Sequence, residues 1–237
     1  MACKVGSARS SYGNTAAGDQ NGGKEVSTQD WYLHSLGWVA LVPISDAVAN
    51  DIADCMQWAC DNNNIGYDQN TRNMLYNAAK VYNFDVSKVT KKVNTDCSAL
   101  TRVCCNYAGI PVGDFTTGNL VDTLMKTGKF VKYTCDKYCK TGDYLPRGTI
   151  LCTKSKGHVV IVVKPGDKAA KPIYDKTYIT ITGDSVNVRK AAGTTYGIIR
   201  TVRKGMILSY TDTKTVNGTK WYHIADGWVS GKYAKEG

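Results

Sequence analysis

Apolar residues recur at helical spacing in three stretches of this 237-residue chain. The first runs from Val48 to Ala59, and Ser45 is placed to cap it before DNNNIGY ends it. A second helix is predicted from about Asn70 to Tyr82. The third lies in TDCSALTRVCCNYAG, where Asn94 or Thr95 takes the capping position and Gly109 ends the helix.

Short apolar runs follow these helices. GTILCT (148–153) and HVVIVV (158–163) are joined by KSKG, which predicts a β-hairpin. The opening stretch GSARSSYGNTAAGDQNGGKEV is rich in Gly, Ser, Asn and Thr and predicts an irregular loop. The first part of the chain is therefore expected to be α+β, with helices first and a sheet after them.

The pattern of apolar residues changes after residue 163 and divides the chain into two parts. KPGDKAAKPIYDK (164–176) has almost nothing to bury and predicts a linker. The short runs YITITG, VNVRK, IIRTV, MILSYT, KWYHI and GWVS that follow are typical of a small all-β barrel. We therefore expect a domain at 1–163, a linker at 164–176 and a second domain at 177–237.

The composition, 43% hydrophobic and 21% charged, is that of an ordinary globular protein. No apolar run is long enough for a membrane span, and MACKVGSARSSYG lacks the apolar core of a signal peptide. We expect synthesis in the cytoplasm without a signal peptide, followed by retention there or release to the cell wall by a route that uses no signal, and no membrane insertion. The net charge is +10, of which +7 lies in residues 164–237. This excess favours a polyanionic partner (nucleic acid, a membrane surface or a cell wall), although solubility alone also explains it.

The nine cysteines leave at least one thiol unpaired. Their irregular spacing argues against a disulfide framework, and no C-x-x-C pair indicates a zinc site. We expect no metal and no cofactor, and most cysteines to be small apolar fillers. Cys97 differs, because it falls in the first turn of the third helix, outside the stripe that contains Cys104.

A helix N-terminus stabilises a thiolate, and a nearby imidazole can take the thiol proton. Of three histidines, His34 lies among aromatic residues that suggest surface packing, and His223 lies in the barrel. His158 opens an apolar strand and is the preferred partner of Cys97. The residues alone leave this open, since a lone cysteine is more often buried filler and a lone histidine more often a surface residue.

TDCSALTRVC, LPRGTIL and GHVVIVV resemble, in order and spacing, the signature of the NlpC-type cell-wall peptidases, a papain-like family. The match covers about residues 90–163, and the part before it resembles phage lysins of gut Firmicutes. The resemblance implies a papain-like fold, Cys97 as nucleophile, His158 as general base and acid, and the Cys97 N–H in the oxyanion hole. It also implies substrate-binding roles for Asp96, Ser98 and Tyr12.

The family has a third polar residue about a dozen positions after the histidine, where this chain has GDKAAKP. We therefore expect His158 to be oriented either by a backbone carbonyl or by a polar residue from elsewhere, such as Asp19 or Gln20 in the opening loop. A second departure is Thr149, which stands where the family usually has Asp.

VNVRKAAGTTYGIIRTVRKG and WYHIADGWVSGKYA resemble a bacterial SH3-like domain, a class that commonly binds cell walls. The aromatic residues Tyr196, Trp221, Trp228 and Tyr233 are candidates for wall binding, with packing in the barrel core as the alternative for Trp221 and Trp228.

These resemblances imply a peptidoglycan hydrolase that cuts an amide bond of the stem peptide in Gram-positive walls, as phage endolysins do. Three alternatives stay open: an N-acetylmuramoyl-L-alanine amidase, a wall-binding protein without activity, and a nucleic-acid binder. The last rests on charge alone, because the chain shows no nucleic-acid motif. The oligomeric state is left open.

Overall fold

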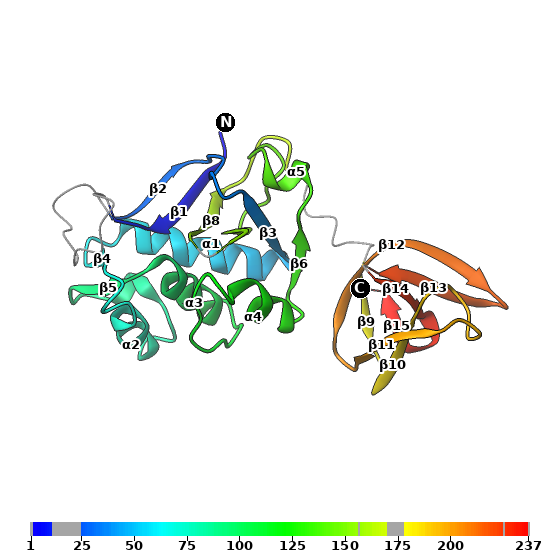
Figure 1. Cartoon of the computed structure of the whole chain (residues 1–237). Helices are drawn as coiled ribbons and strands as arrows, with labels where there is room; N and C mark the ends of the chain where they lie inside the picture. Colours follow the sequence, from blue (N-terminus) through cyan, green and yellow to red (C-terminus); the bar gives the residue numbers. More distant parts are fainter. Residues whose placement is uncertain (1, 11–24, 156, 170–177, 225, 237) are drawn as a thin grey trace. The chain divides into compact units, whose positions relative to one another are not determined.

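In the computed structural model, residues 2–10, 25–155, 157–169, 178–224 and 226–236 are described (Figure 1). The chain divides into two units, Met1–Ala170 and Lys171–Gly237. We describe each unit by itself. None of the helices in the described ranges is both long and apolar enough to cross a bilayer.

A six-stranded sheet forms the centre of the first unit, in the order β2-β1-β8-β7-β3-β6. Every neighbouring pair is antiparallel. The strands are β1 (Lys4–Ala8), β2 (Val26–Asp30), β3 (Trp38–Pro43), β6 (Phe130–Tyr133), β7 (Ile150–Thr153) and β8 (Val159–Lys164). A separate parallel pair consists of β4 (Ile65–Tyr67) and β5 (Val93–Thr95).

Both faces of this sheet are buried, which explains the unbroken apolar run of β8. Val159, Ile161 and Val163 pack toward the helices, in one cluster with residues of α1 (Asp46–Asp61) and α3 (Cys97–Tyr107). Val160 and Val162 point to the other face, where they pack in a cluster with Trp38. Successive side chains of β8 therefore pack into two different cores, and both cores hold the start of the strand in place.

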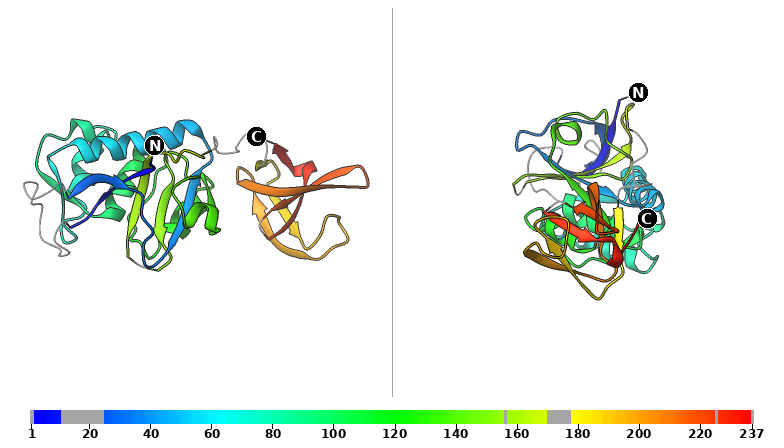
Figure 2. Two further views of the ribbon diagram at one scale, coloured as in Figure 1. Left: turned by 90° about the horizontal axis from the view of Figure 1, so that it is seen from above. Right: turned by 90° about the vertical axis from the view of Figure 1, so that its right-hand side faces the viewer.

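Helices cover one face of the sheet, with α1 lying along it (Figures 1 and 2). The helices of this unit are α1 (Asp46–Asp61), α2 (Met74–Lys80), α3 (Cys97–Tyr107), α4 (Leu120–Lys126) and α5 (Asp136–Cys139), with a 3-10 turn η1 (Val86–Lys88). Ser45 is the N-cap of α1, and the residues from Ala49 to Cys60 that face the sheet are buried at the predicted spacing. α3 packs against both α1 and β8.

Gly148, in the turn before β7, shows how closely this layer approaches the sheet. Its φ is +79°, and a Cβ there would lie 2.2 Å from the backbone oxygen of Ala49 in α1. Only glycine combines this conformation with this contact. The turn therefore fixes where the β7–β8 hairpin meets α1.

The structure confirms the mixed α/β character and the hairpin, and it corrects three details. Residues 6–8 of the stretch predicted as a loop lie in β1, and Val26 begins β2. Because β1, β2 and β3 precede α1, the sheet does not follow the helices in sequence. α2 begins at Met74, four residues later than predicted, after a turn.

The described part of the segment predicted as a linker lies against the first unit. Lys164 is the last residue of β8. The N–H of Gly166 donates to the Leu145 carbonyl at 3.1 Å, and the N–H of Lys168 donates to the Asp143 carbonyl at 2.9 Å. Residues 164–169 therefore belong to the first unit and do not form part of a free linker.

The second unit is an all-β barrel built from a seven-stranded array in the order β11-β10-β14-β13-β12-β9-β15 (Figure 1). The long β12 pairs with β13 along one part and with β9 along another. The elements are β9 (Tyr178–Ile181), β10 (Ser185–Arg189), β11 (Ile198–Arg203), β12 (Ile207–Val216), β13 (Thr219–Ile224), β14 (Gly227–Ser230), the 3-10 turn η2 (Gly231–Tyr233) and β15 (Ala234–Glu236). Each of the six predicted short strands is present.

Candidate active site

The start of α3 is organised by Asp96, which is its N-cap. One carboxylate oxygen, Oδ1, accepts from the Ala99 N–H at 2.6 Å and from the Ser98 hydroxyl at 2.9 Å. The predicted cap at Asn94 or Thr95 is therefore wrong by one or two residues. The consequence is that Cys97 becomes the first residue of the helix, beside the unpaired N–H groups.

The Cys97 side chain is buried at this helix start, with 8% of the residue exposed. Burial, which is the largest cause, and the charge of Asp96 together raise the pKa of the thiol to about 12. The backbone N–H groups of Val159 and Ser98 act in the opposite direction on this pKa. Val159 is the first residue of β8 and directly follows His158, so the thiol lies near the start of that strand.

His158 is held at the head of β8 by its own backbone. Its N–H donates to the Thr153 hydroxyl at 2.9 Å, and its carbonyl accepts from the Thr153 N–H at 3.0 Å. The preceding N–H, that of Gly157, donates to the Thr117 hydroxyl at 3.2 Å. The turn that carries the imidazole is therefore anchored to β7 and to the segment before α4.

Two cationic or titratable side chains flank this imidazole. The His34 ring stacks on the His158 ring at 6.4 Å between centroids and 29° between planes, and it also contacts Trp38. The β1–β8 register pairs Gly6 with Ile161, and continued along β1 it puts Arg9 opposite His158. The Arg9 guanidinium is fixed by Ser27, whose hydroxyl accepts at 2.7 Å.

These surroundings set the protonation of His158. Burial, which is the largest cause, and the charges of His34 and Arg9 together lower the pKa of His158 to about 4. At neutral pH His158 is therefore a neutral imidazole, and Cys97, with its raised pKa, is a neutral thiol. A neutral imidazole is the form that can accept a proton, as a general base requires.

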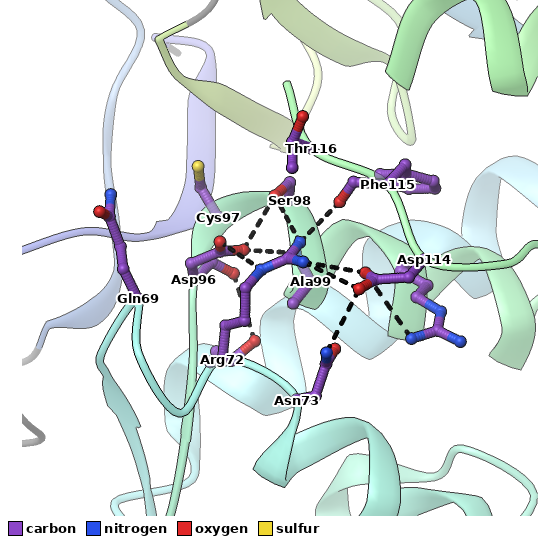
Figure 3. A network of polar contacts seen from close by, with 12 residues as sticks. Gln69, Arg72, Asn73, Asp96, Cys97, Ser98, Ala99, Asp114, Phe115 and Thr116 are labelled. Carbon is purple, nitrogen blue, oxygen red and sulfur yellow. Dashed lines mark hydrogen bonds and ion pairs between the residues drawn. The ribbon is translucent and has the colours of Figure 1, made fainter. Parts of the chain in front are cut away.

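Arg72 joins the start of α3 to the loop before α4 (Figure 3). Its Nε donates to Asp96 Oδ2 at 2.6 Å, and one terminal nitrogen, NH2, donates to the Ser98 hydroxyl at 3.0 Å and to the Phe115 carbonyl at 2.6 Å. The other, NH1, contacts both oxygens of Asp114, at 3.0 and 3.1 Å. Figure 3 shows the Cys97 sulfur pointing away from this network, which therefore holds the first turn of α3 on the side away from the sulfur.

The structure places the predicted substrate-binding residues as follows. Asp96 and Ser98 adjoin Cys97, and both side chains are engaged in the contacts just described. Tyr12 lies outside the described residues, as do Asp19 and Gln20, the candidates for orienting His158. The substrate-binding roles stay predictions. Thr149, where the family has Asp, is buried and its hydroxyl donates to the Pro146 carbonyl at 2.8 Å.

Sequence reasoning missed three residues near this site: Arg9, Arg72 and His34. His34 was assigned to surface packing, but it is half-buried and lies against His158. A usable signal existed for it, because WYLHSLGW leads directly into an apolar strand. Arg72 and Arg9 had none, since their partners are distant in sequence.

All nine cysteines are free thiols, and all but Cys135 are buried. Cys104 and Cys105 are fully buried in the core under α3, as expected for apolar fillers. Within the described ranges, no three His, Cys, Asp or Glu side chains converge as metal ligands do.

The barrel places three of the four predicted wall-binding residues at two adjoining cavities. Trp221 lines both, Tyr196 lines the larger and Tyr233 the smaller. Trp228 is on β14, 4.8 Å from the ring of His223, and lines neither cavity. The core of the barrel is formed by aliphatic residues and Tyr222 rather than by Trp221 or Trp228.

Comparison with known families identifies both units. Residues 7–169 match the endolysin-like domain, which spans more than half of the chain and contains Cys97, His158 and Arg72. The chain belongs to the endolysin-like domain family. Residues 184–235 of this endolysin-like protein match the bacterial SH3 domain. No curated protein and no solved structure matched the chain.

The two matches together support a peptidoglycan hydrolase-like function, in which an endolysin-like domain is combined with a domain that fits cell-wall binding. The endolysin-like and SH3-like parts of the expected architecture are thereby confirmed, whereas the papain-like, NlpC-type nature of the first domain stays a prediction. The catalytic type is a separate matter and rests on the residues of the site.

Proposed function

We propose that this endolysin-like protein hydrolyses an amide bond in the stem peptide of Gram-positive peptidoglycan, with Cys97 as nucleophile and His158 as general base and acid. The observation that carries the proposal is the position of the Cys97 thiol. It lies at the N-terminus of α3, near the N–H of the residue that follows His158. A thiol, an imidazole and a helix terminus are the parts that an acyl transfer needs.

The reaction begins from a neutral pair. His158 takes the proton of Cys97 as the sulfur attacks the carbonyl carbon, and the N–H of Cys97 stabilises the oxyanion. The tetrahedral intermediate collapses when the leaving amine receives that proton from His158, which leaves a thioester. Water then attacks the thioester, again with His158 as base, and releases the carboxylic acid and the free thiol.

Burial of both groups favours this neutral start over a preformed ion pair. A lone thiolate in this position would face burial and the Asp96 charge, and a lone imidazolium would face His34 and Arg9. We infer that charge develops only in the transition state, where thiolate and imidazolium stabilise each other.

Asp96, Ser98 and Arg72 support this chemistry by holding the first turn of α3. Both oxygens of Asp96 have partners within the protein, one at the helix N–H and one at the guanidinium of Arg72. We propose that this fixes the N–H of Cys97 for the oxyanion. Direct binding of the substrate amine by Asp96 remains part of the proposal. Binding to the wall is assigned to the aromatic residues of the barrel, Tyr196, Trp221, Trp228 and Tyr233.

A digest of purified, cross-linked Gram-positive peptidoglycan tests the function. Wild type and Cys97→Ala are incubated with the same walls, and the released fragments are identified by mass spectrometry. We expect new termini within the stem peptide from wild type only. New termini between the muramic acid and L-Ala would instead make the protein an amidase. Equal release by Cys97→Ala would overturn the assignment of the nucleophile.

A further inference from the structure

Arg9 is a half-buried cation that directly follows β1, and it forms no ion pair with the residues that the structure describes. Lys4, at the other end of the strand, pairs with Asp30 at 3.1 Å. Burial lowers the pKa of the Arg9 guanidinium, which is still charged at neutral pH. A cation that is taken out of water without a counter-charge lowers stability, so such a position is characteristic of a site for an anionic ligand.

Two serines on neighbouring strands fix the guanidinium of Arg9. Nη1 donates to the Ser7 hydroxyl at 3.3 Å and to the Ser27 carbonyl at 3.1 Å, and Nη2 donates to the Ser27 hydroxyl at 2.7 Å. A guanidinium has five N–H donors, so within the described ranges the N–H of Nε and one N–H of Nη2 are left over. Nε and Nη2 flank one edge of the planar group, and arginine binds a carboxylate with two parallel hydrogen bonds along such an edge.

Arg9 lies on the face of the sheet that is turned away from the helices. Ser7 pairs with Ser27 in the β1–β2 register, and Arg9 follows two residues later on the same face. Val5, also on this face, packs in the cluster that contains Trp38. The guanidinium is therefore on the side of the sheet where the aromatic residues around Trp38 gather.

The same side leads to the imidazole of His158. The ring of His34 is 5.2 Å from that of Trp38 and 6.4 Å from that of His158. The β1–β8 register, continued along β1, puts Arg9 opposite His158, and neighbouring strands are about 4.8 Å apart. One residue of an extended peptide spans about 3.5 Å. A carboxylate one or two residues away from a bond held between Cys97 and His158 is therefore within reach of Arg9.

We propose that Arg9 binds a free carboxylate on a residue beside the scissile amide bond, so that the hydrolase prefers stem peptides whose carboxylates are not amidated. This inference rests on the proposed function, because it specifies which form of the stem peptide the Cys97 site accepts. A carboxylate accepts both N–H groups of the fork, whereas a carboxamide offers one oxygen and turns an NH2 group toward the cation. A site built to pair with one group rejects the analogue that lacks it, since the buried donors are left without a partner.

Two preparations of one cell wall test this preference. Gram-positive walls whose stem peptides carry free carboxylates are used directly, and a second portion is amidated with a carbodiimide and excess ammonia. Full-length wild type, Arg9→Gln, Arg9→Lys and Lys4→Gln are incubated with each portion. The initial rate at which new amino termini form is measured, with Cys97→Ala as the blank. Lys4→Gln is the matched control, because it removes one positive charge from the same strand at a side chain that is 47% exposed.

The ratio of the two rates is compared between the proteins. Within each protein this ratio cancels the fraction that is folded, and any effect of amidation on binding by the barrel is the same in all four. We expect wild type and Lys4→Gln to favour the walls with free carboxylates by about tenfold or more, and Arg9→Gln to lower the ratio by about the same factor. Arg9→Lys should lie between them, because lysine keeps the charge but not the fork.

A wild-type ratio near one, or the same ratio in wild type and Arg9→Gln, would overturn the carboxylate site and leave the hydrolase in place. An equal loss of preference in Lys4→Gln would also overturn it, because overall charge rather than the Arg9 fork would then set the ratio. Absence of Cys97-dependent release from both wall preparations would overturn the proposed function and this inference with it. The two failures are thus distinguishable in one experiment.

Discussion

Arg72 and Asp96 form an ion pair with 2.6 Å between Nε and Oδ2, and Asp96 is the N-cap of the helix that begins with Cys97. Both side chains are largely buried, at 16% and 12% exposure. The turn before α2 thus controls the geometry of the candidate nucleophile through a single planar side chain. Asp114, which is 46% exposed, extends the pair to the loop before α4 but is screened by solvent.

Replacement of Arg72 tests this connection. We expect Arg72→Ala to lower the free energy of unfolding by about 3 kcal/mol, because it leaves the buried Asp96 charge without its partner. Arg72→Lys restores the charge but not the fork that reaches Asp96, Ser98 and Phe115 at once, so it should recover part of the stability and little of the activity. Urea unfolding and fragment release from walls measure the two effects. Full activity in Arg72→Ala would exclude a positioning role.

Cys97 and Cys104, both on α3, are expected to have different functions. Cys97→Ala is expected to lower hydrolysis by several orders of magnitude and to leave wall binding unchanged, because it removes the nucleophile and nothing in the barrel. Cys104→Ala is the matched control on the same helix. It leaves a small cavity in the core and should cost about 1 kcal/mol of stability while hydrolysis is retained. Wall pull-down, fragment release and thermal unfolding give the three readouts. Loss of hydrolysis in Cys104→Ala at a temperature where it is folded would contradict this separation.

The sequence predicted those parts of the fold and site that depend on neighbouring residues. It did not predict those that depend on contacts between residues far apart in the chain. The α3 helix and the β7–β8 hairpin were predictable, because their periodicity and turn residues are local. The Asp96 cap was missed by one position, since Thr95 is an equally good capping residue and only the backbone distinguishes them. β1 was missed because KVGSA is short and contains Gly and Ser, and its burial comes from β8 and α1.

Arg72 lay beyond sequence reasoning for a different reason. Its contact with Asp96 spans 24 residues of the chain, and nothing in TRNM indicates it. Cys97 and His158 could be singled out from sequence because they lie in recognisable motifs. The residues that surround them and set their pKa values could be found only in the tertiary structure.

Gly148 and Gly109 make a pair that separates backbone strain from steric contact. Both have positive φ, +79° and +72°, but a Cβ at Gly148 would meet the Ala49 backbone, whereas one at Gly109 meets nothing within 4 Å. Gly109→Ala should therefore cost only the conformational penalty, about 1–2 kcal/mol. Gly148→Ala must also displace α1 or the hairpin, and we expect it to cost roughly 2 kcal/mol more. Equal losses in urea unfolding would show that the close approach of the hairpin to α1 is not constrained.

The pH dependence of hydrolysis follows from His158. Its folded pKa of about 4 is below the ordinary value of 6.5, so the imidazole stays neutral, and able to accept a proton, well below neutral pH. The acid limb of kcat/KM on soluble peptide should therefore lie near pH 4 rather than near 6.5. An acid limb at about 6.5 would mean that His158 is solvated in the working enzyme, or that another group is the base.

Stability gives an independent reading of the same shift. Because the folded state binds fewer protons at His158 than the unfolded state between pH 4 and 6.5, this contribution is fully present above pH 6.5 and is lost as the pH falls toward 4. The slope cannot exceed about 1.4 kcal/mol per pH unit for one proton. We expect wild type to lose more stability than His158→Gln across this range in urea unfolding, since glutamine does not titrate. Parallel curves for the two proteins would show that His158 is not desolvated in the folded state, and the neutral thiol–imidazole start of the reaction would then lose its support.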